Sequence, residues 1–343
     1  MPLAEIGTSI IAAPMAGGTS TPGFVAAVHR AGGLGFLAAG YKSADAVGTE
    51  IRACREAGIR FGVNVFVPDP AQLDPSPDAV ATLEEYRSSL HRDAARYGVT
   101  VPPLVLDDDD AWQSKLDLLL QDPVELVSFA FGLPGSSVVQ ALRKAGSTVL
   151  ATVTSCAEAE LAADRGFDAL VVQHSSAGAH SGAFLPAVEQ GAMPPSTSDL
   201  IREVAAAVGL PLIAAGAVSD AATVRAVIAA GAVAAQVGTA LLRTDESGAR
   251  QLHKDALGDD RYTDTTPTRA FTGRYARALV NDFVRDHGDA PQGYPAIHHL
   301  TAPIRAAAAA AGDRERLNLW AGEGWRSART GPVAGAIGAL LDD

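Results

Sequence analysis

The chain alternates short apolar runs with longer amphipathic segments, and this alternation limits the possible folds more than any other feature. Most amphipathic segments repeat with the period of a helix, and several end in glycine, the residue expected just beyond a helix end. Eight apolar runs have the length of strands: Ser9–Met15, Leu34–Gly40, Phe61–Val67, Leu126–Phe131, Thr148–Val153, Ala169–Gln173, Pro211–Ala215 and Ala234–Val237. Because helical segments separate most of them and hairpin turns are missing, we expect parallel pairing.

Eight parallel strands favour a closed α/β barrel of the TIM (β/α)8 type, and 343 residues are enough to build one. An open sheet of six strands is the alternative. Residues 246–325 follow the eighth run and carry a threonine-rich stretch and an alanine run. We expect them to form an inserted helical cap, followed by a last barrel helix at 332–341. The predicted domains are a barrel of residues 1–245 and 326–343 and a cap, or substrate domain, of residues 246–325.

Charge and composition exclude several classes of protein. The formal net charge is −12, so a nucleic acid or another polyanion would be repelled by most of the surface. The two cysteines, Cys54 and Cys156, lie in no CxxC pair, which fits a reducing compartment. No uncharged apolar stretch is long enough to span a membrane, and the first residues lack the pattern of a signal peptide. We therefore expect a cytoplasmic protein that is not bound to a membrane.

In a parallel barrel, function lies where strands end and helices begin. At the first junction, residues 13–23, paired glycines would let backbone approach a flat ligand, or would simply form a tight turn. At the third, Asn64 interrupts an apolar strand, so its amide is either tied to backbone or presented to a ligand. Gly216 and the pair Gly238 and Thr239 follow the seventh and eighth strands. Backbone N–H groups there favour a phosphate cradle, with ordinary turns as the alternative.

The stretch VVQHSSAGAHSGAF, residues 171–184, leads from the sixth strand into a loop of small residues around two histidines. His180 lies seven residues beyond Gln173, with small neighbours that let the loop fold over a ligand. An imidazole exchanges protons near neutral pH, so His180 is a candidate acid or base. The alternative is a histidine on a surface loop.

Other motifs carry less. Residues 33–38 match a dinucleotide fingerprint, but they end a helix and enter a strand, which is the wrong order. No HExxH or GxSxG motif occurs. We expect the acidic run Asp107–Asp110 to be a solvated turn and helix cap, and His298 and His299 to lie exposed in a loop. Cys156, at a helix start, has no base beside it in the sequence, so we expect a structural role, and we expect no metal site.

Six stretches together resemble the nitronate monooxygenase family, formerly called 2-nitropropane dioxygenases, whose members are FMN-dependent TIM barrels. They span almost the whole chain in the order that the family has: APMAGGTSTP, FGVNVFVP, VVQHSSAGAHSG, PLIAAGAVSDAATVRAVIAAGAVAAQVGTALL, TRAFTGRYARAL and LWAGEG. The resemblance implies a TIM barrel, FMN as the cofactor, and a small anionic substrate and molecular oxygen as partners. A homodimer is also expected.

The resemblance assigns roles to individual residues. His180 would abstract the α-proton of a nitroalkane or orient a nitronate that is already anionic. One electron would then pass from the nitronate to FMN, and oxygen would complete the oxidation to a carbonyl compound and nitrite. Met15 and Asn64 would lie against the flavin, and Gln173 would lie near its polar edge. The residues that hold its phosphate would be Gly216, Gly238 and Thr239. The full set is Met15, Asn64, Gln173, Gly178, Gly216, Ala217, Gly238 and Thr239.

The chain departs from the family pattern Gln-Gly-x-Glu-Ala-Gly-Gly-His-Arg-Gly around the histidine. His174 stands in place of the first glycine, and Ser176 in place of the glutamate. Ala179 replaces the glycine just before the histidine, and Ser181 replaces the arginine. We expect different loop anchoring and pocket charge, and a narrower choice of backbone conformation at Ala179. Two other functions are kept open: an FMN-dependent, NAD(P)H-using reductase of the enoyl-acyl-carrier-protein reductase type, and a flavin-binding module without turnover.

Overall fold

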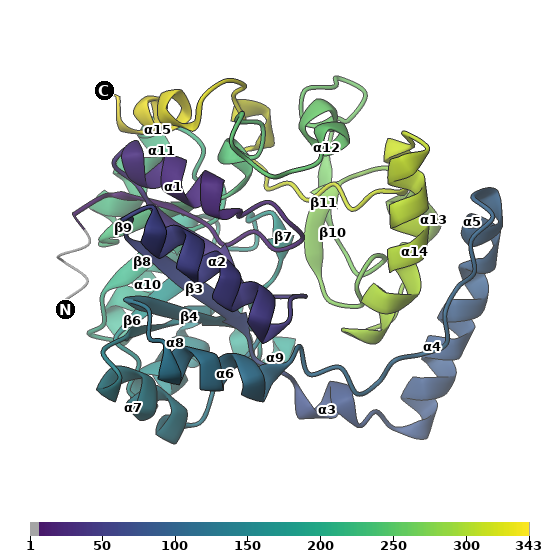
Figure 1. Cartoon of the computed structure of the whole chain (residues 1–343), viewed down its shortest axis with the longest axis horizontal. Coiled ribbons are helices and arrows are strands. Elements are labelled where there is room, and N and C mark those ends of the chain that lie inside the picture. Colours follow the sequence, from purple (N-terminus) through teal and green to yellow (C-terminus); the bar gives the residue numbers. More distant parts are fainter. Residues whose placement is uncertain (1–6, 343) are drawn as a thin grey trace.

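The computed structural model describes residues 7–342 and confirms the closed barrel of eight parallel strands (Figure 1). The barrel closes where the first strand pairs with the last, with Ile11 opposite Gln236. Its strands are β1 Ile10–Ala12, β2 Leu34–Ala38, β3 Phe61–Phe66, β4 Leu126–Ala130, β5 Thr148–Val153, β6 Ala169–Gln173, β8 Leu212–Ala215 and β9 Ala234–Val237. Each predicted run contains one of them. The first run was predicted too long, because Met15 leaves the ladder and its N–H bonds the Ser20 hydroxyl.

Eight helices follow the barrel strands and pack around them. Many begin at a side-chain cap: Thr21 accepts from the N–H of Phe24, and Asp220 forms a capping box with Thr223. These caps place helix N-termini beside the carboxyl ends of the strands. The helices are α1 Pro22–Arg30, α2 Ala44–Glu56, α6 Trp112–Gln121, α7 Ser136–Lys144, α8 Cys156–Asp164, α10 Thr197–Ala207, α11 Ala221–Ala229 and α15 Val333–Leu341. No helix in this described range is long and apolar enough to cross a membrane.

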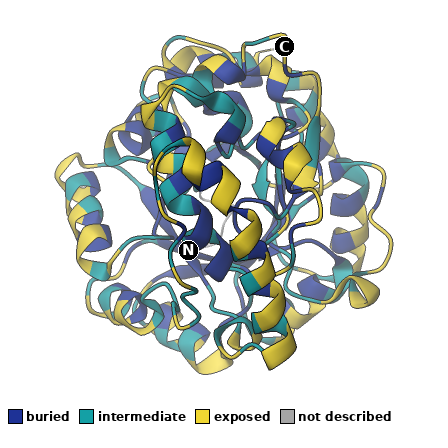
Figure 2. Ribbon diagram, turned by 90° about the vertical axis from the view of Figure 1, so that its right-hand side faces the viewer, coloured by how far each residue is buried: buried dark blue, intermediate teal, exposed yellow. Residues whose placement is uncertain are grey.

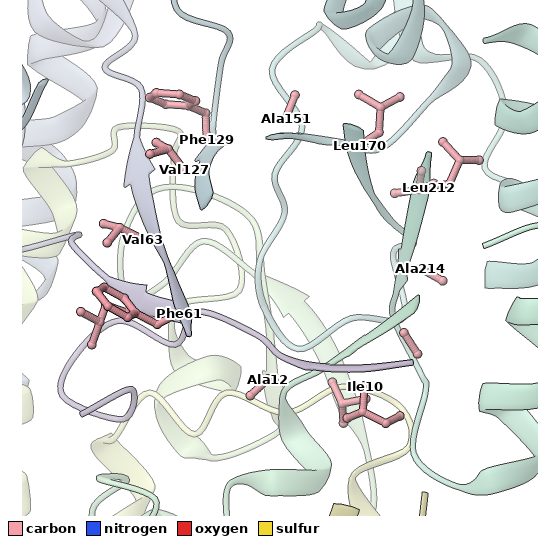
Figure 3. Close-up of a cluster of buried hydrophobic side chains, with 14 of the residues drawn as sticks. Ile10, Ala12, Phe61, Val63, Val127, Phe129, Ala151, Leu170, Leu212 and Ala214 are labelled. Carbon is pink, nitrogen blue, oxygen red and sulfur yellow. The ribbon is translucent and has the colours of Figure 1, made fainter. Parts of the chain in front are cut away.

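Side chains alternate along each strand between two apolar layers. In β8, Ile213 belongs to the cluster inside the barrel, while Leu212 and Ala214 belong to the layer between strands and helices. Figure 3 shows that outer layer, with Leu170, Leu212 and Phe129 pointing away from the ring of strands. Both layers are buried, so side chains fill the interior of the barrel. A ligand can therefore bind only at an end of the barrel.

Two further parts of the chain lie beside the barrel. We call residues 246–325 the cap region. It holds strands as well as helices: α12 Gln251–Ala256, β10 Thr265–Thr268, β11 Ala276–Leu279, α13 Asp282–Asp286, α14 Ala296–Ala310, η3 Arg314–Arg316 and the start of η4 Trp325–Ser327. The other part follows β3 and consists of α3 Pro70–Leu73, α4 Pro77–Ser89 and α5 His91–Arg96, which confirms the helix predicted near Glu84–Arg96. The remaining short elements are α9 Ala187–Gln190 and η2 Thr239–Leu241.

Helices α4 and α5 share a core with the cap region. Leu83 and Leu90 pack in one buried cluster with Phe271, Phe283 and Ile297. Figure 1 shows α4 and α5 beside α13 and α14 at one end of the molecule, and Figure 2, which views that end, shows exposed residues on the outer faces of the helices there. The cap region is therefore held by two helices that end 150 residues before it begins.

A small second sheet joins the cap region to the barrel. Its strands have the order β10-β11-β7, where β7 is Ala179–His180 in the loop after β6. The pairing is antiparallel, with His180 opposite Ala276 and Ala179 opposite Arg277. The candidate histidine is thus part of a sheet that the cap region completes.

The acidic run Asp107–Asp110 differs from its prediction as a solvated turn. Asp110 forms an ion pair with Lys115, whose side chain is 1% exposed, with 2.7 Å between Nζ and Oδ2. It also accepts the backbone N–H of Tyr41 at 2.7 Å. Asp108 accepts from His299 Nε2 at 2.7 Å. The run connects α6, the loop after β2 and α14, contacts that charge pattern alone does not reveal.

Candidate active site

A cavity of about 290 Å³ lies between the carboxyl ends of the barrel strands and the cap region. Barrel residues such as Ala130 and Ala215 line one side, and Arg250 and Trp320 of the cap region line the other. All nine residues singled out in the sequence line it: Met15, Asn64, Gln173, Gly178, His180, Gly216, Ala217, Gly238 and Thr239. The residues that the strand-end rule selected therefore all lie around one cavity, at one end of the barrel.

The cavity differs in charge from the rest of the protein. Among the described residues that line it there is no aspartate or glutamate, although the whole chain carries a net charge of −12. Two guanidinium groups, from Arg250 and Arg305, and several imidazoles line it instead. Such a lining attracts anions and has no acidic group that would repel them.

The loop after β8 offers backbone donors to an anion. Gly216 has φ +115° and Ala217 has φ +48°, so successive N–H groups turn toward one side, as in the concave anion sites of other proteins. In the described part of the chain, the N–H groups of Ala217, Val218 and Thr239 donate to no acceptor. These donors face the cavity at two neighbouring strand ends, where barrel enzymes commonly hold phosphate.

A second side of this cradle is formed where two loops touch. A Cβ added to Gly178 would lie 2.5 Å from the N of Gly322 and 2.8 Å from Thr239 Oγ1. Thr239 Oγ1 accepts the Gly322 N–H at 3.0 Å, which leaves its own proton available. The absence of a side chain at Gly178 therefore allows the backbone to close over the anion site.

The remaining predicted cofactor residues contact the cavity in different ways. Asn64 donates from Nδ2 to Ser128 Oγ at 2.9 Å, so its amide is anchored in the barrel. Met15 packs between the barrel core and the cap-region core. Gln173 uses both ends of its amide on the histidine loop: Nε2 donates to the His180 carbonyl at 3.1 Å, and Oε1 accepts from the Gly182 N–H at 2.7 Å.

His180 is half-buried and surrounded by aromatic rings. The centroids of Phe131, Tyr294 and Trp320 lie 5.6, 5.9 and 5.4 Å from its own. Burial lowers the pKa of His180 to about 3, with further lowering from the charges of Arg274 and Arg305. The imidazole is therefore neutral at neutral pH and has a free lone pair.

The hydrogen-bond network indicates which nitrogen carries the proton. His180 Nε2 lies 2.9 Å from Thr272 Oγ1, and that hydroxyl donates to the carbonyl of Arg274 at 3.3 Å. Because a hydroxyl has a single proton, Nε2–H must donate to Thr272, and the lone pair lies on Nδ1. Nδ1 is then the atom that can take a proton.

The altered loop around His180 is anchored by residues that sequence reasoning missed. Glu158 of α8 is fully buried and accepts the N–H groups of Phe184 and Leu185 at 2.6 and 2.9 Å. Arg274 donates to the carbonyls of Ser181 and Ala183. An acidic and a basic side chain thus hold this loop from other elements, where the family pattern has them within the loop.

Ala179 has φ +62°, the left-handed region in which a Cβ is strained. The glycine that the family pattern has at this position would adopt it freely. Pairing of β7 with β11 fixes the conformation in this chain.

Three further cavity residues were not predicted: Tyr41, His298 and Arg305. His298 and His299 were expected to be exposed in a loop, which is wrong for both: His299 lies in α14 and bonds Asp108, and His298 lines the cavity. His298 lies in the first turn of α14, stacked face to face on Tyr41 with 4.1 Å between centroids, and burial lowers its pKa. Tyr41 directly follows β2 and could have been found by the strand-end rule. Nothing in the local sequence marks Arg305.

A parallel (β/α)8 barrel with a cavity at the carboxyl ends of its strands, lined by unbonded backbone N–H groups and a neutral histidine, defines a class, the TIM-barrel proteins with a site at that end. The family model described as nitronate monooxygenase matches residues 2–343. The chain belongs to the nitronate monooxygenase family, and it is an oxidoreductase of that type.

Individual relatives agree with this assignment. A probable nitronate monooxygenase of Staphylococcus aureus strain MSSA476 is 36% identical over 340 residues, covering 97% of this chain and 93% of the relative. The crystal structure of nitroalkane oxidase from Streptomyces ansochromogenes is similar with a TM-score of 0.92 and 45% identity, covering 98% of this chain and 95% of that one. FabK from Thermotoga maritima is more distant, with a TM-score of 0.74, 25% identity, and 99% and 93% of the two chains covered.

Proposed function

We propose that this protein binds FMN in the cavity and uses molecular oxygen to oxidise small anionic nitronates, and nitroalkanes that lose their α-proton at the site, to a carbonyl compound and nitrite. The observation that carries the proposal is a cavity whose described lining has no acidic residue, together with a half-buried, neutral His180 in that lining. Both the phosphate of FMN and a nitronate are anions, and the lining suits both.

The residues present fit FMN. The unbonded N–H groups after β8 and β9, with the Thr239 hydroxyl, would hold its phosphate, and the space that Gly178 leaves open would let the loops close around it. Met15 and Asn64 would contact the flavin ring, and Gln173 would position the loop at its polar edge. When bound, FMN supplies the redox chemistry by accepting an electron from the nitronate.

His180 would serve the proton step. For a neutral nitroalkane, Nδ1 takes the α-proton while Nε2–H stays bonded to Thr272. The same charges that lower the pKa of His180, from Arg274 and Arg305, attract the anion that forms. Because the pKa of His180 is low, the imidazole is a weak base for removing an α-proton. The enzyme should therefore use preformed nitronates more readily than neutral nitroalkanes.

The relatives support the substrate class. The Streptomyces ansochromogenes protein is a nitroalkane oxidase, and the Staphylococcus aureus proteins are probable nitronate monooxygenases. Cys54 and Cys156 are both free thiols, which suits a cytoplasmic location.

An anaerobic titration tests the proposal. The purified protein is titrated with propionate 3-nitronate while the visible flavin absorbance is followed, and a parallel sample receives NADH. We expect FMN to be present, the nitronate to change the flavin absorbance, and NADH to leave it unchanged. Bleaching by NADH but not by nitronate would overturn the proposal in favour of a reductase. A flavin that responds to neither would favour a binding module.

A further inference from the structure

Tyr41, His298 and Arg305 form one wall of the cavity and have no role in the function proposed so far, apart from the field of Arg305 at His180. They come from the loop after β2 and from α14, far apart in the sequence. Each of the three side chains carries a hydrogen-bond donor.

Tyr41 is held in a strained conformation with φ +65°, which is rare for an aromatic residue. Its backbone N–H donates to Asp110, which is itself fixed by the buried Lys115. The hydroxyl oxygen is buried beside the hydroxyl of Tyr294, and it makes no hydrogen bond of standard geometry within residues 7–342. Burial raises the pKa of Tyr41 to about 12, so the hydroxyl keeps its proton. A buried ion pair maintains this strain and holds Tyr41 at the cavity wall, with a hydroxyl that is neither hydrogen-bonded nor open to solvent. An unsatisfied polar group at a strained position beside a cavity indicates a ligand contact.

His298 presents a donor because of its neighbour. Arg305 Nη2 lies 3.3 Å from His298 Nδ1, and a guanidinium can only donate. Nδ1 is therefore the acceptor, and the single proton of the neutral ring lies on Nε2. Among the described residues this Nε2–H has no partner, and the ring is fixed by its stacking on Tyr41.

Arg305 is a half-buried cation in the cavity wall, without a counter-ion among the described residues. Its guanidinium bonds only neutral groups, namely Thr301 Oγ1, Asn318 Oδ1 and the Nδ1 and carbonyl of His298. No described carboxylate makes an ion pair with it, and burial lowers its pKa to about 10, so it stays charged at neutral pH. A buried charge is costly unless it is paired, and the cavity is where an anion could pair with it.

We propose that Tyr41, His298 and Arg305 form an oxyanion subsite that holds the oxygen atoms of the substrate's nitro or nitronate group. The subsite adjoins the proton acceptor: the ring of Tyr294 lies 5.9 Å from His180 and 6.4 Å from Tyr41. As His180 Nδ1 takes the α-proton, the C–H electron pair moves into a C=N bond and negative charge moves onto the nitro oxygens. Donors already placed there stabilise that charge without having to reorganise.

The inference rests on the proposed function but can be tested without turnover. Nitrate is a planar oxyanion with the shape of a nitronate group and undergoes no reaction there. Its affinity for the purified protein is measured by calorimetry in the wild type and in Tyr41→Phe, Arg305→Met and Arg305→Lys. Tyr41→Phe removes one unbonded hydroxyl and leaves the ring stacked, so the fold should be kept.

We expect Tyr41→Phe to weaken nitrate binding about 10-fold and Arg305→Met about 100-fold, the usual cost of losing a hydrogen bond to a charged group and of losing the charge itself. Arg305→Lys should restore part of the affinity. The exposed residues Tyr275 and Arg202 supply matched controls, and Tyr275→Phe and Arg202→Met should leave the affinity unchanged. In nitronate oxidation, Tyr41→Phe and Arg305→Met should each show a higher KM and a lower kcat than the wild type, with the flavin absorbance unaltered.

The outcomes separate the two proposals. Nitrate affinity that is unaltered in folded Tyr41→Phe and Arg305→Met, or no nitrate binding by the wild type, overturns the subsite. If nitrate binds as expected and the nitronate leaves the flavin unchanged, the subsite stands and the proposed function fails. If nitronate is oxidised equally well by all variants, the function stands and the subsite fails.

Discussion

At the scale of single residues, the site combines histidines that desolvation keeps neutral with Arg305, a cation that has no acidic partner among the described residues. His180 owes most of its low pKa to burial and the rest to two guanidinium groups. Those two guanidinium groups have different tasks, because Arg274 anchors the loop while Arg305 lines the cavity. In the functions proposed above, His180 takes the proton and Arg305 binds the anion, and the charge of Arg305 also lowers the pKa of His180.

Replacing His180 by asparagine should separate the two kinds of substrate. His180→Asn removes the base but keeps a polar group of similar size, so FMN binding should persist. Turnover of neutral nitroalkanes should fall by a factor of about 100 or more, the usual contribution of a positioned base, while preformed nitronates keep much of their rate. Steady-state kcat/KM for nitroethane and for its nitronate measures this. Unchanged nitroalkane turnover would remove His180 from its role.

The residue scale also shows what the sequence can and cannot predict. All nine predicted site residues line the cavity, because strand ends in a parallel barrel must meet at one face. Arg305 was missed since its burial comes from packing of α14 against other parts of the chain. His298 was misplaced for the same reason: its stacking partner Tyr41 lies more than 250 residues away. Side-chain burial between distant segments leaves no local pattern.

At the scale of elements, the cradle depends on two loops that touch through glycine. Gly178 follows β6, and Gly322 lies near the end of the cap region, so the end of the cavity that we propose for phosphate is closed by segments from the barrel and from the cap region. The close approach is between backbone atoms, which cannot move aside as a flexible side chain can.

A side chain at Gly178 should therefore separate these loops. In Gly178→Val, the Cβ would lie 2.5 Å from the backbone of Gly322, so the loops must move apart and FMN should bind at least 10-fold more weakly. Flavin release on dilution, followed by fluorescence, measures it. The control is Gly335→Ala in α15, where a Cβ meets nothing within 4 Å. This change should keep FMN and raise the free energy of unfolding by about 0.5–1 kcal/mol. Equal FMN affinity in both variants would contradict the cradle.

Most barrel elements could be predicted because their signal is local. Alternating apolar runs and capped helices are properties of ten or fifteen neighbouring residues. The sheet β10-β11-β7 escaped prediction because β7 has two residues and gains its pairing only from β11. The division into barrel and cap domains stays a prediction, and the core shared by Leu83 and Phe271 shows that residues before 246 also support the cap region.

At the scale of the whole molecule, buried histidines should make stability depend on pH. Burial lowers the pKa of His180 to about 3 and of His253 to about 4, and lowers that of His298 as well. In the unfolded chain these groups titrate near 6.5, so the unfolded state binds more protons below that pH. Stability is therefore full above about pH 6.5 and falls as the pH decreases toward 4, by up to about 1.4 kcal/mol per pH unit for each imidazole.

Denaturant unfolding between pH 7 and pH 5 measures this dependence. His253→Gln should reduce the slope by about one imidazole's share, while His91→Gln, at an exposed position, should leave it unchanged. Equal slopes in the wild type and His253→Gln would show that this histidine does not remain neutral in the folded protein.

The pairing of β7 with β11 has a consequence for biosynthesis. The last barrel strand is complete at Val237, yet His180 is fixed by Ala276 and Thr272, which the ribosome adds later. A nascent chain can therefore have every strand of its barrel before His180, the proposed proton acceptor, has a fixed position. Reactivity at this site belongs to the finished polypeptide, and a chain that stops after the barrel strands would lack it.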